Sequence, residues 1–100
     1  MTGAYNDTFT ASGNGKITLL SFSTTGNSYS GSAGNYPVAG SFYVTNNTTG
    51  VSQGYSTGDS GSYTFSNTSV SFSSGDSITI SAYVYNHSGG GNTTVKYQFE

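Results

Sequence analysis

The sequence contains no cysteine and no tryptophan, and it is almost without charged side chains. Without cysteine, neither disulfide bonds nor thiolate metal sites can stabilise the fold. Charged residues make up 6% of the 100-residue chain, with two lysines and no arginine. Two cations cannot neutralise the row of phosphates of a nucleic acid or form a basic membrane-surface helix. No apolar run of about 20 residues is present to span a bilayer, so we expect no nucleic-acid partner and no membrane insertion.

Small uncharged polar residues and aromatic residues dominate the composition. Serine, threonine, glycine and asparagine account for 58 of the 100 residues, and aromatic residues for 15%. The net charge of −2 is too small, and the aromatic content too high, for a typical disordered chain. Phenylalanine, tyrosine, valine and isoleucine favour strands over helices. The length predicts a single domain over residues 1–100, with residues 1–8 as an extended N-terminal arm.

Alternation of apolar and polar residues is the main structural pattern and predicts β-strands. It is clearest in residues 78–84 and 95–99, which we interpret as a hairpin or as neighbouring strands across a glycine-rich connection. In residues 16–24 the apolar positions change phase, which indicates a β-bulge or a strand buried on both faces. Shorter candidates, and one loop at 25–36, complete the chain. With about seven to nine short strands, we predict an all-β antiparallel β-sandwich of jelly-roll or immunoglobulin-like type.

The run from Ser69 to Val84 carries a family resemblance. It contains an apolar strand, a turn at Gly75-Asp76 and a second alternating strand. This order is similar to the late strands of jelly-roll proteins, among them trimeric complement- and tumour-necrosis-factor-like heads, phage fibre modules and subunits of bacterial surface or spore appendages. The similar stretch covers 16 of the 100 residues. The resemblance implies an architecture and a bias toward assembled structures, although the cysteines that cross-link some spore-appendage subunits are absent.

Residues suited to catalysis or metal binding are few. His87 is the only imidazole and lies beside Ser88 and three glycines, a setting that does not hold a general base in position. Asp59 and Asp76 each lie in a Gly/Ser turn, where an aspartate normally bonds its own backbone. We expect no catalytic residue, no cofactor and no metal site. A calcium ion bound near Asp59 or Asp76 with backbone carbonyls is the alternative that stays open.

The nine tyrosines carry more functional information. Alternation places Tyr83 and Tyr85 on the face opposite the isoleucines of their strand, and Tyr43 opposite its own apolar neighbours. Tyr55 lies in a turn-rich stretch. Exposed tyrosines add contact area at little entropic cost, which favours a subunit interface or a ligand platform. For Tyr83 and Tyr85 the structural alternative is that their rings face a second sheet or cover the first.

Sequons of the form Asn-X-Ser/Thr give a further expectation. In a secreted protein they would be glycosylation acceptors on surface loops. About a third of the residues are serine or threonine, so chance also produces such sequons. They occur at Asn6, Asn46, Asn47, Asn67, Asn86 and Asn92.

The low charge has a consequence for the edges of the sheets. Edge strands normally carry charges that prevent pairing with other chains, whereas neutral edges accept a strand from a second subunit. Interface burial also adds stability that a small core lacks. We therefore expect a non-catalytic structural protomer that self-assembles into an extracellular fibre, appendage or similar polymer on a cell or virion surface. Residues 1–4 lack the features of a signal peptide. The alternative is a carbohydrate-binding or adhesin module whose exposed tyrosines bind glycans.

Overall fold

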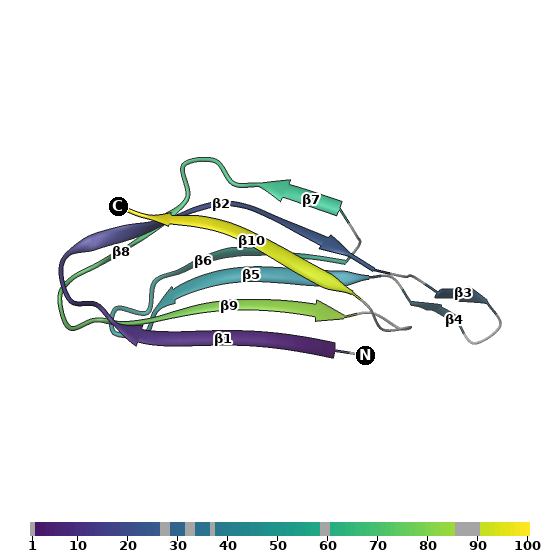
Figure 1. Cartoon of the computed structure of the whole chain (residues 1–100), viewed down its shortest axis with the longest axis horizontal. Helices are drawn as coiled ribbons and strands as arrows, with labels where there is room; N and C mark the ends of the chain where they lie inside the picture. Colours follow the sequence, from purple (N-terminus) through teal and green to yellow (C-terminus); the bar gives the residue numbers. More distant parts are fainter. Residues whose placement is uncertain (1, 27–28, 32–33, 37, 59–60, 86–90) are drawn as a thin grey trace.

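The computed structural model describes residues 2–26, 29–31, 34–36, 38–58, 61–85 and 91–100. Within these ranges the chain forms strands and no helix, which confirms the all-β prediction. Eight strands form two antiparallel four-stranded sheets, in agreement with the predicted sandwich (Figure 1). The strands are β1 (Thr2–Thr10), β2 (Gly15–Thr25), β3 (Tyr29–Gly31), β4 (Gly34–Tyr36), β5 (Ala39–Asn46), β6 (Ser52–Thr57), β7 (Gly61–Thr64), β8 (Ser69–Phe72), β9 (Ser77–Tyr85) and β10 (Asn92–Phe99).

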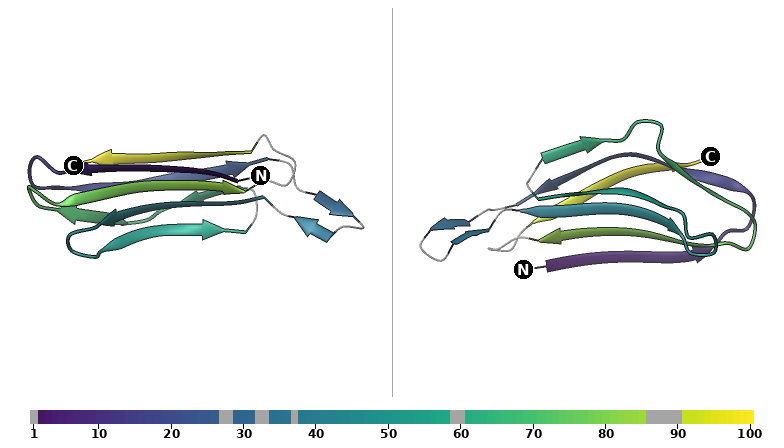
Figure 2. Two further views of the ribbon diagram at one scale, coloured as in Figure 1. Left: turned by 90° about the horizontal axis from the view of Figure 1, so that it is seen from below. Right: turned by 180° about the vertical axis from the view of Figure 1, so that it is seen from behind.

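The chain passes repeatedly between the two sheets. The first sheet has the order β1-β9-β5-β6, and the second has the order β10-β2-β7. Strand β8 also pairs with β2. It pairs with the first part of β2, Gly15–Thr18, whereas β7 pairs with the following part, Ser21–Thr24. The remaining strands, β3 and β4, form a separate hairpin that projects beyond one end of the sandwich (Figure 2). The molecule is elongated, with extents of 53 × 23 × 19 Å.

The edge strands of the two sheets meet at two opposite sides of the sandwich. The rings of Phe9 in β1 and Phe99 in β10 have centroids 5.9 Å apart. On the opposite side, the rings of Tyr55 in β6 and Tyr63 in β7 lie 4.2 Å apart. We call these the β1–β10 side and the β6–β7 side.

Two predictions about connections are wrong. Strands β9 and β10 are not a hairpin, because β9 pairs with β1 and β5 whereas β10 pairs with β2 in the other sheet. A glycine-rich connection permits either a tight turn or a crossing between sheets, so local sequence does not distinguish them. The expected loop at 25–36 contains the β3–β4 hairpin.

The N-terminal residues do not form the expected arm. Residues 2–8 are the first part of β1 and pair with β9.

Strand β2 contains the predicted bulge. Ile17 and Leu19 are buried before it and Phe22 and Thr24 after it, whereas Leu20 between them is exposed. Consecutive residues of β10 pair with the residues on the two sides of Leu20, which is left as the extra residue. A single extra residue moves the inward positions from odd to even numbers. Both parts of β2 therefore contribute to the same core.

The core lies between the two sheets and consists of aliphatic residues around two phenylalanines. Phe22 and Phe42 face each other from opposite sheets, with centroids 6.5 Å apart in an edge-to-face arrangement. Fully burying one such side chain stabilises the fold by about 1.5–3 kcal/mol. The buried cluster contains Ile17, Leu19, Phe22, Phe42, Val44, Val70, Ile78 and Ile80.

One end of the sandwich is held together by threonines around a glycine. Thr24 is fully buried, and its hydroxyl lies 3.0 Å from that of Thr93. The Thr93 hydroxyl donates a hydrogen bond of 3.0 Å to the carbonyl of Tyr83 in the other sheet, so Thr24 is the donor toward Thr93. A Cβ atom added to Gly40 would lie 2.0 Å from the Thr24 oxygen. Glycine is therefore the residue that lets the two sheets approach here.

The opposite end depends on a buried asparagine. Asn46 is fully buried, and its amide nitrogen donates hydrogen bonds to Asp76 Oδ2 at 2.9 Å and to the Ser71 carbonyl at 3.1 Å. Its amide oxygen accepts from the backbone N–H groups of Thr48 at 3.0 Å and Thr49 at 3.1 Å. One side chain thus connects the turn after β5 with the segment between β8 and β9.

Candidate functional site

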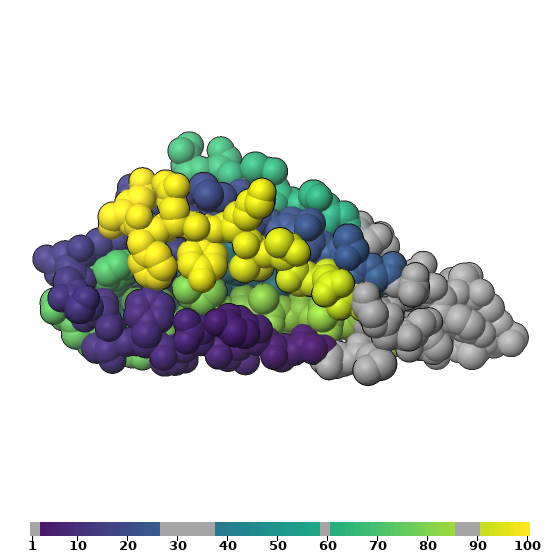
Figure 3. All heavy atoms as spheres, viewed as in Figure 1, coloured from purple at the N-terminus to yellow at the C-terminus, as the bar shows by residue number. Residues whose placement is uncertain are grey.

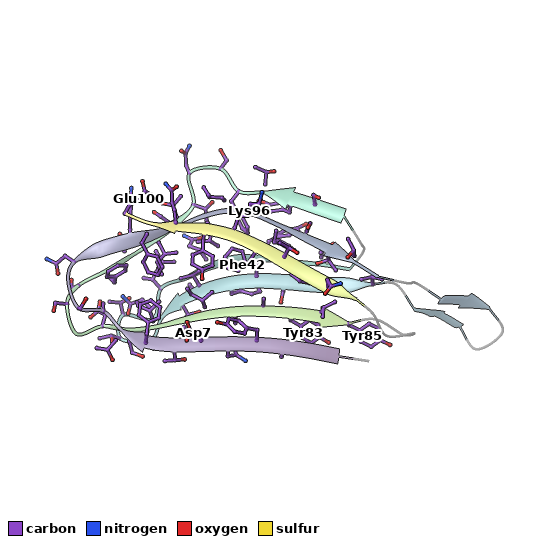
Figure 4. The ribbon with its side chains drawn as sticks, in the orientation of Figure 1. Asp7, Phe42, Tyr83, Tyr85, Lys96 and Glu100 are labelled. Atoms are coloured by element: carbon purple, nitrogen blue, oxygen red, sulfur yellow. The ribbon has the colours of Figure 1, made fainter. Side chains whose placement is uncertain are left out.

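The four tyrosines predicted to form an interface or a ligand platform do not lie together. Tyr43, Tyr83 and Tyr85 alternate with inward residues of β5 and β9 and point to the outer face of the first sheet, as predicted. Figure 4 places Tyr83 and Tyr85 near the start of β1. Tyr55 belongs to the inward set instead, because it pairs with Phe42 in the neighbouring strand.

Tyr43 has a structural task on that outer face. A Cβ atom added to Gly54 would lie 2.4 Å from the Tyr43 ring, so the ring covers the backbone of this glycine. Covering a glycine in an edge strand with a cross-strand aromatic ring stabilises the pairing of the two strands. On this face the ring of Tyr43 therefore covers the neighbouring edge strand β6 at Gly54.

The β6–β7 side is closed by a pair of stacked tyrosines. The rings of Tyr55 and Tyr63 are nearly parallel, with an interplanar angle of 9°. Both rings also approach Phe22 of the core, at 6.4 and 5.9 Å. Tyr55 is 44% exposed and Tyr63 is 37% exposed. The stack joins the two sheets and still presents aromatic surface to solvent.

Two hollows lie beside this stack and share the residues Gly61 and Ser62. The first has a volume of about 200 Å³ and includes both tyrosines and Phe22 in its lining. The second has a volume of about 460 Å³ and is lined by serine, threonine and glycine. No charged side chain lines either hollow among the residues that the structure describes. Together they form a groove that is aromatic at one end and rich in hydroxyl groups at the other. We call it the neutral groove, because its described lining residues carry no charge.

The β1–β10 side is open. Its inward-facing aromatic side chains remain accessible to solvent, with Tyr5 58% exposed, Phe99 56% and Tyr97 36%. Phe99 contacts both Phe9 and Tyr97, with centroid distances of 5.9 and 6.0 Å. In Figure 3 the atoms of β10 (yellow) and β1 (purple) lie on the viewed face, with atoms of β9 (green) visible between them. These exposed side chains form a candidate contact surface.

The outer edges of these two strands are also open. Within the described ranges, β1 pairs only with β9, and β10 pairs only with β2. The backbone N–H and C=O groups along the other edge of each strand are therefore free to pair with a further strand.

Three charged residues lie on or next to the two edge strands of the open side (Figure 4). Asp7 is the only charged residue of β1, and it faces inward between Tyr5 and Phe9. Lys96 of β10 is exposed on the opposite face of its strand. The hydroxyl of Thr18 donates a hydrogen bond to the Glu100 carboxylate, and this bond, with the nearby Lys16, lowers the pKa of Glu100.

The structure also describes one of the two aspartates considered for the alternative calcium site, and most of the sequons. Asp76 accepts hydrogen bonds from Asn46 and from the backbone of Ser73 at 3.0 Å, as expected for an aspartate in a turn. Among the described residues, no group of three or more His, Cys, Asp or Glu side chains is placed to hold a metal ion. Asp59, His87 and the sequon at Asn86 lie outside the described residues.

Burial separates the remaining sequons. Asn46 is fully buried and hydrogen-bonded, so it is not accessible to a glycosyltransferase. The side chains of the other four are exposed. Asn67 lies in a turn with a positive φ of 51°, a conformation that asparagine tolerates better than most residues. The accessible sequons are Asn6, Asn47, Asn67 and Asn92.

Comparisons with known proteins return no relative. No protein-family model, no curated protein and no solved structure matches this chain. The described part of the chain also contains no helix that is long and apolar enough to cross a membrane.

The residues that distinguish the two sides were not singled out by sequence reasoning. Tyr5, Tyr63, Tyr97 and Phe99 occupy inward positions of edge strands. Alternation predicts at most which face of a strand a residue occupies. It does not predict whether that residue is exposed, because exposure depends on whether the strand lies at the edge of its sheet. The signal that could have pointed to the open side was the presence of large aromatic residues near both ends of the chain, at Tyr5 and Phe9 and at Tyr97 and Phe99.

Proposed function

We propose that this protein is a non-catalytic structural protomer that assembles with copies of itself into an extracellular fibre, appendage or similar polymer. The observation that carries the proposal is the open β1–β10 side, where free strand edges and exposed inward-facing aromatic side chains occur together. A second copy that adds a strand there would satisfy the backbone groups of the edge and cover the aromatic side chains. The β6–β7 side also has an edge strand, β6, and exposed inward-facing rings, those of Tyr55 and Tyr63, although these rings are less exposed than Tyr5 and Phe99.

The neutral character of the edges supports the same function. β6 contains no charged residue and β1 contains one. Edge strands of monomeric proteins usually carry lysines or inward-pointing charges that prevent such pairing. Asp7 in β1 and Lys96 in β10 each provide one such charge, whereas β6 and β7 contain none. A buried interface would also stabilise a domain whose core is small.

The test is the particle size of the purified protein, measured by light scattering and negative-stain electron microscopy over a range of concentrations. We expect filaments or large oligomers. Replacing Tyr5→Asp together with Phe99→Asp should return the protein to a monomer, because two further charges would have to be desolvated on the open side.

The outer-face tyrosines provide the matched control. Tyr83→Ser with Tyr85→Ser removes two rings from the other face of the first sheet and should leave the open side intact. Circular dichroism should show that all variants remain folded. A protein that stays monomeric at every concentration, or an assembly that is lost with the outer-face pair and survives the charged pair, would contradict the proposal.

A second candidate function is favoured by the neutral groove on the β6–β7 side. A sugar ring has an apolar face that stacks on aromatic side chains, as Tyr55 and Tyr63 offer, and hydroxyl groups that bond to polar linings such as that of the second hollow. This function is that of a carbohydrate-binding or adhesin module, and it suits a monomer.

The two functions are distinguished by titration of the isotope-labelled protein with neutral hexasaccharides of glucose, xylose, mannose and N-acetylglucosamine. Binding in the groove predicts NMR shift changes at Gly61 and Ser62 that disappear in Tyr63→Ala and persist in Tyr83→Ala. If none of the four sugars produces such shifts, the glycan function is rejected.

A further inference from the structure

We propose that successive copies join head to tail, with β6 of one copy paired antiparallel to β1 of the next. This inference rests on the proposed function and names the surface that the open β1–β10 side contacts, namely the β6–β7 side of another copy. The first sheet of each protomer then continues directly into the first sheet of the next.

Strand direction makes this arrangement possible without reversing the subunit end for end. β1 is antiparallel to β9, β9 to β5, and β5 to β6. After three reversals, β6 runs opposite to β1. A copy that is shifted sideways therefore presents its β1 antiparallel to β6, which is the more stable form of strand pairing. Because each sheet twists, repetition of this step gives a helical filament, as heterologous contacts that do not close generally do.

Across such a junction, each row of side chains on the sheet would meet side chains of a compatible type in the next copy. On the inner face, one row of directly paired residues begins at Asp7 in β1 and ends at Gln53 in β6. The next row begins at Tyr5 and ends at Tyr55. Extending the rows places Gln53 opposite Asp7 of the next copy and Tyr55 opposite its Tyr5. The amide of Gln53 supplies a hydrogen-bond donor to the carboxylate, and two tyrosines in a cross-strand pair attract each other.

The outer face shows the same continuity. Thr8 and Thr79 lie with hydroxyl oxygens 2.9 Å apart, and so do Thr45 and Ser52 in the same row. A neighbouring copy would bring its Thr8 beside Ser52 and extend this ladder of hydroxyl groups. Cross-strand threonine and serine pairs of this kind stabilise a sheet.

Charge argues against the competing two-fold arrangement, in which β1 would pair with β1 of the second copy. Centring that pair on Asn6 would place two Asp7 carboxylates diagonally on one inner face, about 7–8 Å apart. Both carboxylates would lie among the aromatic residues of two joined open sides, where like charges are costly. In the head-to-tail arrangement, Asp7 faces the neutral strand β6.

The exposed aromatic surfaces also match. The open side presents Tyr5 and Phe99, and the opposite side presents the stack of Tyr55 and Tyr63. Head-to-tail contact buries both surfaces in every copy. Two-fold contact would bury the open side and leave the tyrosine stack in solvent.

Cysteine cross-linking tests the arrangement directly, because the natural chain contains no cysteine. Directly opposite residues in antiparallel strands have Cα atoms about 4.5–5.5 Å apart, within the range of about 4.4–6.8 Å that a disulfide bridges. Thr8→Cys protein carrying a size tag is mixed with untagged Ser52→Cys protein under assembly conditions and oxidised. We expect the mixed dimer to be the main product on a non-reducing gel, and the chain with both substitutions to give a ladder of covalent multimers.

Ser81→Cys is the matched control, since this residue lies on the same outer face but in the interior of the sheet. Its mixture with Ser52→Cys should give no mixed dimer. Asn6→Cys tests the competing arrangement, because two-fold pairing centred on Asn6 places this residue opposite itself. Homodimers of Asn6→Cys as the main product would overturn the inference in favour of two-fold pairing. Absence of the mixed dimer, while light scattering shows the same proteins assembled, would also overturn it. If no assembly is detected at all, the proposed function itself fails.

Discussion

Asn46 and Asp76 show how two polar side chains define one end of the sandwich. The buried amide of Asn46 uses both of its atoms, as donor to Asp76 and Ser71 and as acceptor from two backbone N–H groups. Removing Asp76 would leave the buried Asn46 amide with one hydrogen bond fewer, and removing Asn46 would break all four hydrogen bonds at once. The pair therefore specifies how the turn after β5 meets the segment before β9.

This arrangement predicts a dependence of stability on pH. Hydrogen bonds from Ser73 and Asn46 lower the pKa of Asp76 below its ordinary value of 3.8. The charged carboxylate therefore stabilises the folded state fully above the pKa of the unfolded chain, and this contribution is lost as the pH falls through the lower pKa of the folded state. We expect the midpoint temperature of thermal unfolding, measured by circular dichroism, to decrease once the pH is lowered below about 4.

Asp76→Asn should make the midpoint vary less with pH in that acidic range. Glu100, whose pKa is lowered mainly by the hydroxyl of Thr18, adds a second contribution of the same sign. Glu100→Gln therefore serves to separate the two. An identical acid profile for the natural protein and Asp76→Asn would show that Asp76 is not linked to folding.

Asp7 and Gln53 provide a residue-scale prediction for assembly. Gln53→Asp would place two carboxylates opposite each other at the junction, and a like-charge pair in that position costs about 0.2–1 kcal/mol. The concentration needed for assembly should rise by up to about fivefold. Adding Asp7→Asn should restore it, because the double variant exchanges the acid and the amide. Light scattering measures both effects, and failure of the second substitution to rescue would contradict the pairing.

At the scale of single elements, the bulge in β2 decides which side chains enter the core. Deleting Leu20 would turn Phe22 and Thr24 to the outer face while Ile17 and Leu19 stay inside. We expect a loss in the free energy of unfolding of at least about 3 kcal/mol, the typical cost of removing a buried phenylalanine. Leu20→Thr keeps the residue count and should change stability by less than about 1 kcal/mol. Urea titration distinguishes the two outcomes.

The approach of the sheets at Gly40 gives a second prediction at this scale. Gly40→Ala adds a methyl group where the nearest atoms are those of Thr24 and Thr93. Overpacking of this kind typically costs about 1–3 kcal/mol. Gly13→Ala is the control, because nothing lies within 4 Å of its added Cβ. Equal midpoints of urea unfolding for the two variants would mean that the sheets separate at little cost.

At the scale of the whole molecule, the interface proposed here is almost uncharged. Screening by salt weakens interactions between exposed charges and has little effect on hydrogen bonds between backbones or on aromatic contacts. We expect the degree of assembly, measured by light scattering, to change little between about 0.05 and 0.5 M sodium chloride. Dispersal of the polymer at the higher concentration would indicate an electrostatic interface and contradict the β-edge model of assembly.

The sequence by itself determined the features that depend on near neighbours along the chain. Alternation predicted β9 and β10, the phase change before Phe22 predicted the bulge, and the scarcity of charge predicted edges with few charges. These signals are local, because side chains in a strand alternate with a period of two residues.

Only the tertiary structure decided which strands lie at the edges and which sheet each strand joins. It placed β9 and β10 in different sheets and made an edge strand of the expected N-terminal arm. It also turned Tyr55 inward against Tyr63 and left Tyr5 and Phe99 exposed on one open side. The physical reason is that pairing between strands far apart in the sequence sets these positions, and a pattern with a period of two carries no information about which partner a strand will have.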